Sequence, residues 1–187
     1  MKNKHNVIGF IIFTAIFITG CTNLQPATKN TSNFNDINCV GEVTNPPQGM
    51  VETNDEQLLN SALGASGEGK LCKGKVFVAT EPVKVYRVWN SDKDFTLYGS
   101  WWSFDQPEGP RQQYQEENVI CPSWSKLDRM SACTLKIGTK LVVGPGQSAK
   151  CKDMTYPQSA VNQVFIPNDS RNNVLYVDNC TNGNAWP

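Results

Sequence analysis

Arg87 is a cation that the sequence places on the hydrophobic face of a predicted strand. The run Val83–Trp89 alternates apolar and polar residues, and on such a strand Arg87 shares one face with Val85 and Trp89. A guanidinium there either keeps its head in water while its stem covers apolar neighbours, or is a planar cation placed to bind phosphate. The spacing alone leaves both interpretations open.

Gln163 occupies a similar position on a second predicted strand, over residues 161–167. It shares a face with Val161 and Phe165, so its amide points where hydrophobic side chains point. A buried amide needs hydrogen-bond partners. Gln163 is therefore either a structural hydrogen-bond node or a residue that contacts a ligand.

An aromatic segment from Phe95 to Phe104 lies between these two strands. It includes Tyr98 and the adjacent pair Trp101 and Trp102. Adjacent residues on a strand face opposite sides, so we expect only one of the two tryptophans in the main core. The other is then available to line a pocket and stack on a flat ligand.

The composition narrows the chemistry further. The chain of 187 residues contains one histidine, His5, in a segment that we expect to be removed on export. Without histidine the protein lacks Ser-His-Asp and Cys-His catalysis, and a zinc site would have no imidazole ligand. Lys and Arg together number 17, as do Asp and Glu, and this balance argues against a nucleic-acid partner. Any chemistry must use Arg, Gln, Glu, Asp and aromatic side chains.

The N-terminus predicts export. Residues 1–20 have the pattern of a secretory signal peptide, with two lysines before an apolar run that ends in small residues. The sequence around Cys21 resembles a bacterial lipobox and predicts its lipidation; a plain signal peptide with a coincidental cysteine is the alternative. Residues 21–38 are polar and predict a flexible tether to a membrane. We expect one domain over 39–187, lipid-anchored to a bacterial cell envelope or secreted.

Six cysteines remain when Cys21 is set aside. An even number in an exported chain predicts three disulfides, although six cysteines can pair in many ways. A metal cluster is the alternative, but no two cysteines have the CxxC spacing typical of such sites. The predicted disulfide residues are Cys39, Cys72, Cys121, Cys133, Cys151 and Cys180.

The hydrophobic patterns predict an α+β domain built on mainly antiparallel sheets. Helices are short: one begins after the N-cap Asp55, and one covers 111–120 and ends before Pro122. Strands dominate, and no alternation of strands with long helices indicates a parallel sheet. The predicted strands are 75–80, 83–89, 99–103, 131–137, 139–143, 161–167 and 172–177.

Several short blocks occur in an order that is familiar from one enzyme family. They are YRVW at 86–89, GSWWS at 99–103, ICPSW at 120–124, GT at 138–139 and NQVFIP at 162–167. Together they resemble NAD glycohydrolases of the tuberculosis necrotizing toxin type, and in particular the secreted fungal surface NADases. The resemblance covers about residues 72–170. It implies an ADP-ribosyltransferase-like fold, with sheets around an NAD cleft.

Residue by residue, the resemblance assigns the catalytic positions to Arg87 and Gln163. It places a pocket aromatic on Phe95 and, as a looser match, a second phosphate-binding arginine on Arg111. The remaining substrate-binding residues come from the GSWWS block: Trp101, Trp102 and Ser103. Some relatives use a histidine near the site, and the fungal enzymes bind calcium through a C-terminal extension. Neither feature is evident here, so we expect no metal and no cofactor.

The chemistry of NAD fits these residue types. Its phosphates suit arginine forks, and its cationic nicotinamide suits an aromatic face. Nicotinamide is already a good leaving group, so the bond breaks through an oxocarbenium-like state without a general acid. We therefore expect hydrolysis of NAD or NADP to nicotinamide and ADP-ribose. The sequence leaves two protein assemblies open, a homodimer and a complex with an immunity-type inhibitor.

Two other functions stay open. Mono-ADP-ribosyltransferases that modify arginine carry a Gln/Glu-x-Glu pair, whereas the residue two before Gln163 is Val161. The missing glutamate favours hydrolysis over transfer. A non-catalytic surface lipoprotein that binds a nucleotide or a protein is the alternative of a different class.

Overall fold

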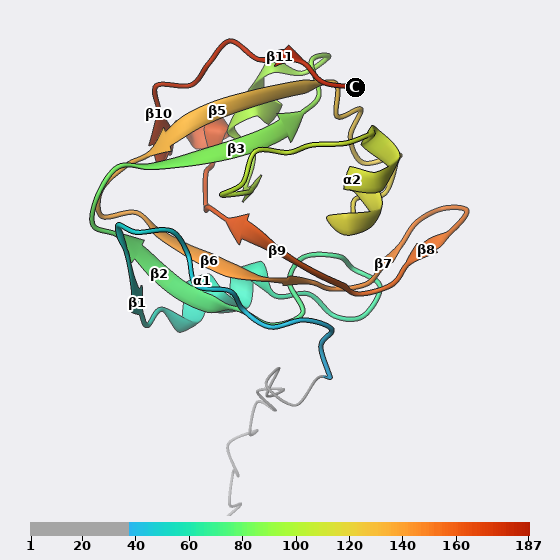
Figure 1. The fold of residues 1–187 in the computed structure, drawn as a ribbon, viewed down its shortest axis with the longest axis horizontal. Helices are drawn as coiled ribbons and strands as arrows, with labels where there is room; N and C mark the ends of the chain where they lie inside the picture. The colour runs from blue at the N-terminus through green and yellow to red at the C-terminus, as the bar shows by residue number, and fades with distance from the viewer. Residues whose placement is uncertain (1–37) are drawn as a thin grey trace, which may run out of the picture. The chain divides into compact units, whose positions relative to one another are not determined.

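The structure, a computed structural model, describes residues 38–187 (Figure 1). The predicted signal peptide over 1–20, the lipidation of Cys21 and all but the last residue of the tether over 21–38 lie outside the described residues. Within the described part of the chain, no helix is long and apolar enough to span a bilayer.

Two antiparallel sheets form the framework, as predicted for an α+β domain. The larger has the strand order β1-β2-β6-β9-β4. Its strands are β1 (Met50–Thr53), β2 (Lys75–Ala79), β6 (Lys140–Gly146), β9 (Ser159–Phe165) and β4 (Trp101–Trp102). In the smaller sheet, β5 pairs with β3 on one edge and with β10 and β11 on the other. These strands are β3 (Val83–Trp89), β5 (Arg129–Leu135), β10 (Val177–Asp178) and β11 (Asn184–Ala185).

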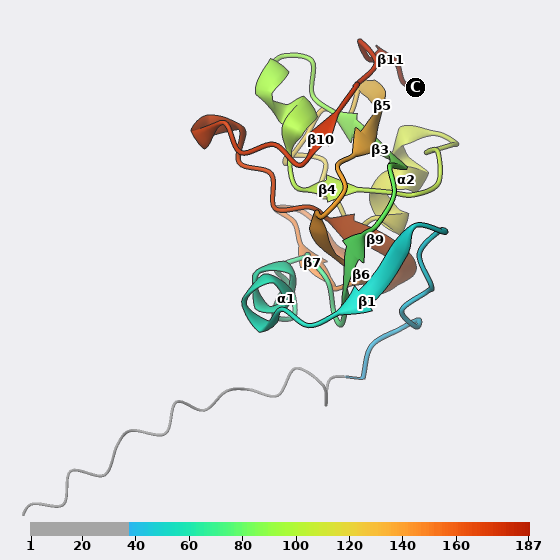
Figure 2. The same cartoon turned by 90° about the vertical axis from the view of Figure 1, so that its left-hand side faces the viewer.

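The remaining elements are short. They are the helices α1 (Glu56–Ala62) and α2 (Arg111–Glu117), the 3-10 turns η2 (Asp94–Tyr98) and η3 (Ser170–Asn172), and a hairpin of β7 (Ala149–Lys150) and β8 (Thr155–Tyr156). Helix α1 begins as predicted, because the carboxylate of Asp55 accepts the backbone N–H of Leu58 at 3.1 Å. Figures 1 and 2 show α2 beside β9, between the two sheets.

Strand β4 joins the two sheets, although it is shorter than the strand predicted over 99–103. Trp101 and Trp102 pair with β9 of the larger sheet. The next residue, Ser103, exchanges two backbone hydrogen bonds with Tyr86 of β3, at 2.8 and 2.9 Å. The strands β3, β4 and β9 are therefore neighbours across the junction, which brings the predicted site residues of all three strands to one place.

The main core lies between the sheets. Its largest side chains come from inward positions of both sheets and are buried almost completely: Phe77, Val85, Trp102, Leu135, Leu141, Val164 and Ile166. Val85 and Trp89 are buried on the face that the alternation of β3 predicted. Trp102 is in this core and Trp101 is not, which confirms the expectation for the tryptophan pair.

The helix predicted over 111–120 ends earlier than expected. It stops at Glu117, and Val119 has a left-handed backbone conformation with φ of 53°. A β-branched residue in that region is unusual and a helix cannot continue through it. The turn leads the chain from α2 into the loop that precedes β5.

The strand predicted over 172–177 is wrong for most of its length. The turn η3 ends at Asn172, Asn173 has a left-handed backbone conformation, and β10 begins only at Val177. The cause is Asp169, whose carboxylate accepts the backbone N–H groups of Arg171 and Asn172 at 3.2 and 3.3 Å. Such a local side-chain cap competes with strand pairing, and hydrophobic alternation does not reveal it.

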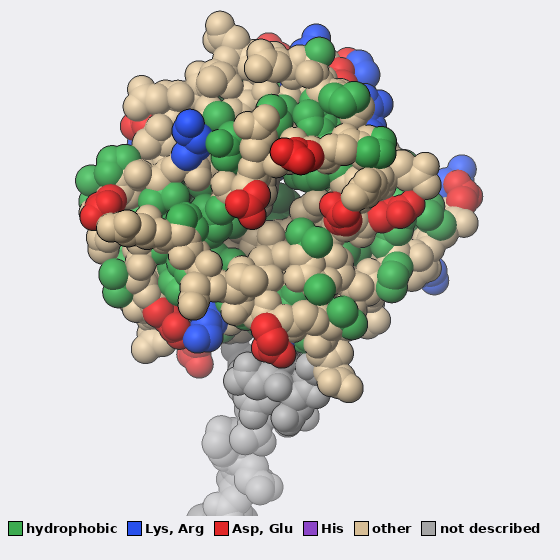
Figure 3. All heavy atoms as spheres, viewed as in Figure 1, with side chains coloured by type: hydrophobic (Ala, Val, Ile, Leu, Met, Phe, Trp, Pro, Cys, Tyr) green, Lys and Arg blue, Asp and Glu red, His purple; other side chains and the backbone are tan. Residues whose placement is uncertain are grey.

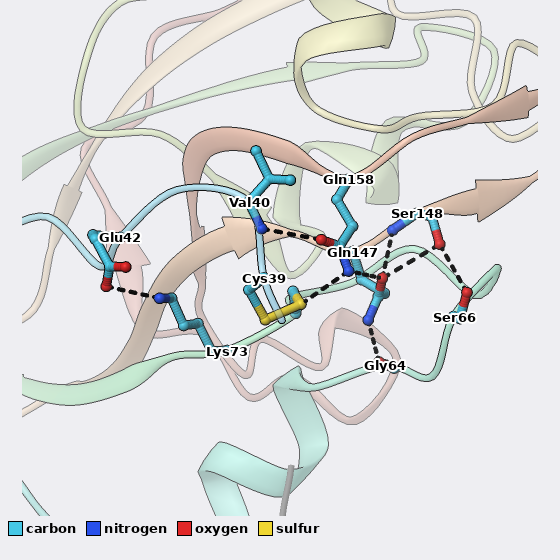
Figure 4. Close-up of a disulfide and its surroundings, with 10 residues drawn as sticks. Cys39, Val40, Glu42, Gly64, Ser66, Lys73, Gln147, Ser148 and Gln158 are labelled. Atoms are coloured by element: carbon cyan, nitrogen blue, oxygen red, sulfur yellow. Dashed lines mark hydrogen bonds and ion pairs between the residues drawn. A yellow bond between two sulfur atoms is a disulfide. The ribbon is translucent and has the colours of Figure 1, made fainter. Parts of the chain in front are cut away.

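All six predicted cysteines form disulfides, and the structure supplies the pairing. The bridges are Cys39–Cys72, Cys121–Cys151 and Cys133–Cys180. The first ties the N-terminal segment to the chain before β2, beside the buried Gln147 (Figure 4). There Gln158 accepts the Val40 N–H at 3.0 Å and donates to the side-chain oxygen of Gln147 at 3.0 Å.

Reduction should therefore destabilise the domain strongly. The bridges span sequence separations of 33, 30 and 47 residues. Loops of that length correspond to about 4 kcal/mol each in the chain-entropy model. We expect reductant to lower the melting temperature by at least about 10 °C.

Intact mass should rise by about six hydrogens on reduction, as three bridges require. Two or more free thiols in the unreduced domain would contradict the three-disulfide framework.

Candidate functional site

A cavity of about 210 Å³, which we call the Arg87 cavity, lies where β3, β4 and β9 meet. It brings together Arg87, Gln163, Trp101 and Trp102, which belong to the predicted site. Helix α2 and the loop after it close the other side. The complete lining is Lys70, Arg87, Val88, Trp101, Trp102, Tyr114, Asn118, Val119, Ile120, Trp124, Ser125, Leu127 and Gln163.

Arg87 is a half-buried cation that no acid neutralises. Its Nε donates to the Thr96 carbonyl at 2.7 Å and its Nη1 donates to the Trp101 carbonyl. The guanidinium also lies 5.9 Å from the ring centroid of Trp102. Among residues 38–187, no carboxylate forms an ion pair with it. Burial lowers the pKa of Arg87 to about 10, so it stays charged at neutral pH and favours an anionic ligand.

Gly99 allows this placement of the guanidinium. A Cβ atom at Gly99 would lie 2.2 Å from one terminal nitrogen of Arg87 and 2.6 Å from its Cζ. The φ of Gly99 is −71°, which any residue can adopt, so the requirement is space and not backbone freedom. The glycine of the GSWWS block therefore has a physical role: its bare backbone packs directly against Arg87.

Gln163 is a buried amide with part of its hydrogen-bonding capacity unused. It is 6% exposed, and its Nε2 donates to the Asn118 carbonyl at 3.0 Å, at the end of α2. No described residue donates to its Oε1, and no fully buried side-chain polar atom in 38–187 lacks a partner. The Oε1 atom is therefore accessible from the cavity. Gln163 is therefore a structural hydrogen-bond node that holds the end of α2, and its oxygen is free to accept a hydrogen bond from a ligand.

Three tryptophans surround the Arg87 cavity with different exposures. Trp101 is half-buried and packs against Phe165 with the ring centroids 5.1 Å apart. Trp102 is buried, and its indole donates to the Gly99 carbonyl at 2.7 Å. Trp124 is 52% exposed. The cavity therefore offers aromatic faces at its wall and at its surface.

Three predicted substrate residues do not line this cavity. Arg111 donates to the Leu127 and Trp186 carbonyls at 3.1 and 3.3 Å. Ser103 donates to the Asp105 carbonyl at 2.7 Å and faces the neighbouring hollow described below. Phe95 is 50% exposed on η2 and lines a hollow on the other side of Arg87.

The sequence analysis missed Lys70, Tyr114 and Arg171. Lys70 and Tyr114 line the Arg87 cavity. Arg171 lies with its Cζ 6.0 Å from the ring centroid of Phe95. None of the three belongs to a family block or to the hydrophobic face of a predicted strand. Only the packing of α2, η3 and the glycine-rich segment 64–70 places them near Arg87 or Phe95.

The Arg87 cavity and the adjacent hollow are lined by side chains of opposite charge. The cavity has two cations, Lys70 and Arg87, and no carboxylate in its lining. The adjacent hollow, of about 580 Å³, is lined by Asp105, Glu108 and Glu117 and by no Lys or Arg. Figure 3 shows acidic side chains around the opening on this face. A phosphate-bearing ligand is therefore favoured in the Arg87 cavity and disfavoured in the acidic hollow.

No family model, curated protein or solved structure matches the chain. Within residues 38–187, no cluster of three or more His, Cys, Asp or Glu side chains is arranged to hold a metal ion.

Proposed function

We propose that the protein is an NAD(P)+ glycohydrolase with an ADP-ribosyltransferase-like fold. The observation that carries the proposal is the pairing of an uncompensated guanidinium with a buried amide in one cavity lined by tryptophan. Arg87 offers N–H donors for phosphate, and Gln163 offers an acceptor and a donor for ribose hydroxyls.

The residues of the cavity favour a dissociative hydrolysis. Nicotinamide leaves without protonation, and the remaining oxocarbenium ion reacts with water, giving nicotinamide, ADP-ribose and one proton. Gln163 cannot act as a carboxylate base, so its part is to hold the ribose in the orientation for bond cleavage. The half-buried ring of Trp101 covers the nicotinamide. The described lining of the Arg87 cavity contains no carboxylate that could activate an arginine acceptor, which supports hydrolysis over transfer.

The cavity is small for a whole dinucleotide. At about 210 Å³ it accommodates the nicotinamide end, with the diphosphate at Arg87 and the adenosine outside. The hollow that contains Phe95 begins on the other side of Arg87 and offers room of about 320 Å³ for that part. Phe95 would then contact the portion of the substrate beyond the diphosphate.

We also propose that the enzyme is exported and anchored by a lipid on Cys21. Three disulfides support an oxidising compartment. A domain tethered to the envelope would meet NAD outside the cytoplasm. Metabolic labelling with a fatty-acid analogue, compared between the parent and Cys21→Ala, tests the anchor.

Cleavage of a fluorescent NAD analogue by the purified protein tests the function directly. Release of nicotinamide together with free ADP-ribose supports hydrolysis. ADP-ribose covalently attached to an acceptor protein would indicate a transferase. Stoichiometric binding of NAD without release of nicotinamide would indicate a non-catalytic binding protein.

The pH dependence follows from the ionisable groups of the cavity. Burial lowers the pKa of Arg87 to about 10 and raises the pKa of Tyr114 to about 12. Neither group titrates between about pH 6 and 8, so kcat/KM should be flat there. It should fall above about pH 10, because Arg87 loses its charge. Rates corrected for the spontaneous loss of NAD provide the measurement; an inflection near pH 6.5 would contradict a mechanism without an acid or base.

A further inference from the structure

Tyr114 has an unused hydrogen-bonding group in the Arg87 cavity. Its side chain lines the cavity, and its hydroxyl makes no hydrogen bond with any described residue. Because no fully buried side-chain N or O atom in 38–187 lacks a partner, this hydroxyl is not fully buried. The side chain lines both the Arg87 cavity and the adjacent acidic hollow. A phenol that is mostly removed from water normally finds a partner, so an open hydroxyl here is available to a ligand.

The C-terminal segment fixes the ring of Tyr114. Trp186 packs edge-on against it, with the ring centroids 5.0 Å apart. Trp186 is itself held by its backbone N–H, which donates to the Asp128 carbonyl at 3.0 Å. Its carbonyl accepts from Arg111 at 3.3 Å. Arg111, expected to bind phosphate, instead holds the residue that orients Tyr114.

Tyr114 and Arg87 both line the Arg87 cavity. Burial raises the pKa of Tyr114 to about 12, against the opposing effect of the Arg87 charge. The phenol therefore stays protonated and can donate at neutral pH. Since the cavity lining contains no carboxylate, neither donor has an acid to bind within it. Two donors without an acidic partner are complementary to an anionic oxygen.

We infer that the Tyr114 hydroxyl is a second donor to the phosphate bound by Arg87, and that Arg111 is a positioning residue that acts through Trp186. This inference rests on the proposed function for the identity of the phosphate group. The structure thus assigns to Tyr114 the contact that the sequence assigned to Arg111.

Tyr114→Phe removes the hydroxyl and keeps the ring against Trp186. We expect its affinity for ADP-ribose to fall at least about tenfold, as for a hydrogen bond to a charged group. The KM for NAD should rise similarly while kcat changes little, because the phosphate contact exists in both ground and transition states. Inhibition by free nicotinamide, which has no phosphate, should not change. Tyr156→Phe is the matched control, since it removes the same hydroxyl from a buried tyrosine that lies outside the cavity.

A double-mutant cycle with Arg111→Lys and Tyr114→Phe separates positioning from direct contact. If Arg111 acts through Tyr114, its replacement weakens ADP-ribose binding in the parent and has no further effect in Tyr114→Phe. Additive losses would overturn the positioning role, and wild-type ADP-ribose affinity in Tyr114→Phe would overturn the assignment of the hydroxyl. If the parent binds ADP-ribose but releases no nicotinamide from NAD, the hydrolase proposal fails while the Tyr114 comparison still decides this inference.

Discussion

Gln163→Ala is expected to lower kcat and kcat/KM together by about 10²–10³-fold. Loss of one preorganised contact that strengthens in the transition state has this magnitude. Equal losses in the two parameters are the signature of an interaction made chiefly in the transition state. Single-turnover release of nicotinamide and steady-state kinetics at saturating NAD measure the two quantities.

The same substitution has a predictable structural cost. Gln163 donates to the Asn118 carbonyl, and alanine leaves that buried acceptor without its partner. We therefore expect a loss of about 1–3 kcal/mol in the free energy of unfolding. Activity must be compared per folded molecule, at a temperature where the variant is native by circular dichroism.

Gln147 provides the matched control. It is completely buried, whereas Gln163 is 6% exposed, and it does not line the Arg87 cavity. Its amide donates to the Gly64 carbonyl and accepts from the Ser148 N–H and from Gln158 (Figure 4). Gln147→Ala should lower stability by at least as much, because this amide makes more hydrogen bonds, and leave the specific activity of the folded protein near that of the parent. If Gln163→Ala behaves in the same way, Gln163 is only structural and the site assignment is lost.

Local patterns predicted the parts of the fold that local physics decides. The alternation of apolar and polar residues over Val83–Trp89 predicted which face of β3 is buried, and Asp55 predicted where α1 begins. Both predictions succeed because strand alternation and helix capping depend on residues only a few positions apart. Even so, the face predicted for Gln163 is only partly correct. Val161, on the same face, is 39% exposed, because the pairing of β6 with β9 becomes irregular after Pro145.

The rest of the site depends on contacts between distant segments. The family resemblance places phosphate binding on Arg111, but the partners of its side chain are carbonyls 16 and 75 residues away. Tyr114 carried no signal, because its role requires Trp186 to fold back against α2. The disulfide pairing was equally hidden, since it follows from which strands become neighbours. The spacing of residues in the sequence specifies none of these three long-range arrangements.

Arg87→Met is expected to reduce kcat/KM about 100-fold, mainly through a raised KM. Arg87 binds phosphate in the ground state as well as in the transition state, so its loss removes binding common to both. Arg87→Lys should recover little of the loss, because an ammonium lacks the planar fork that makes paired hydrogen bonds to phosphate. This division between KM and kcat is the opposite of that expected for Gln163, and the two variants therefore test each other.

Thermal stability gives an independent measure of the same site. Arg87→Met removes a half-buried cation that forms no ion pair with any described carboxylate, and this relief offsets the lost bonds to the Thr96 and Trp101 carbonyls. Its melting temperature should therefore stay within about 5 °C of the parent. ADP-ribose at 100 times its Kd should stabilise the parent by about 2.7 kcal/mol, and the same concentration should stabilise Arg87→Met far less. An equal rise in melting temperature for both proteins would show that the anion binds elsewhere, because a ligand held by Arg87 cannot stabilise a protein that lacks it.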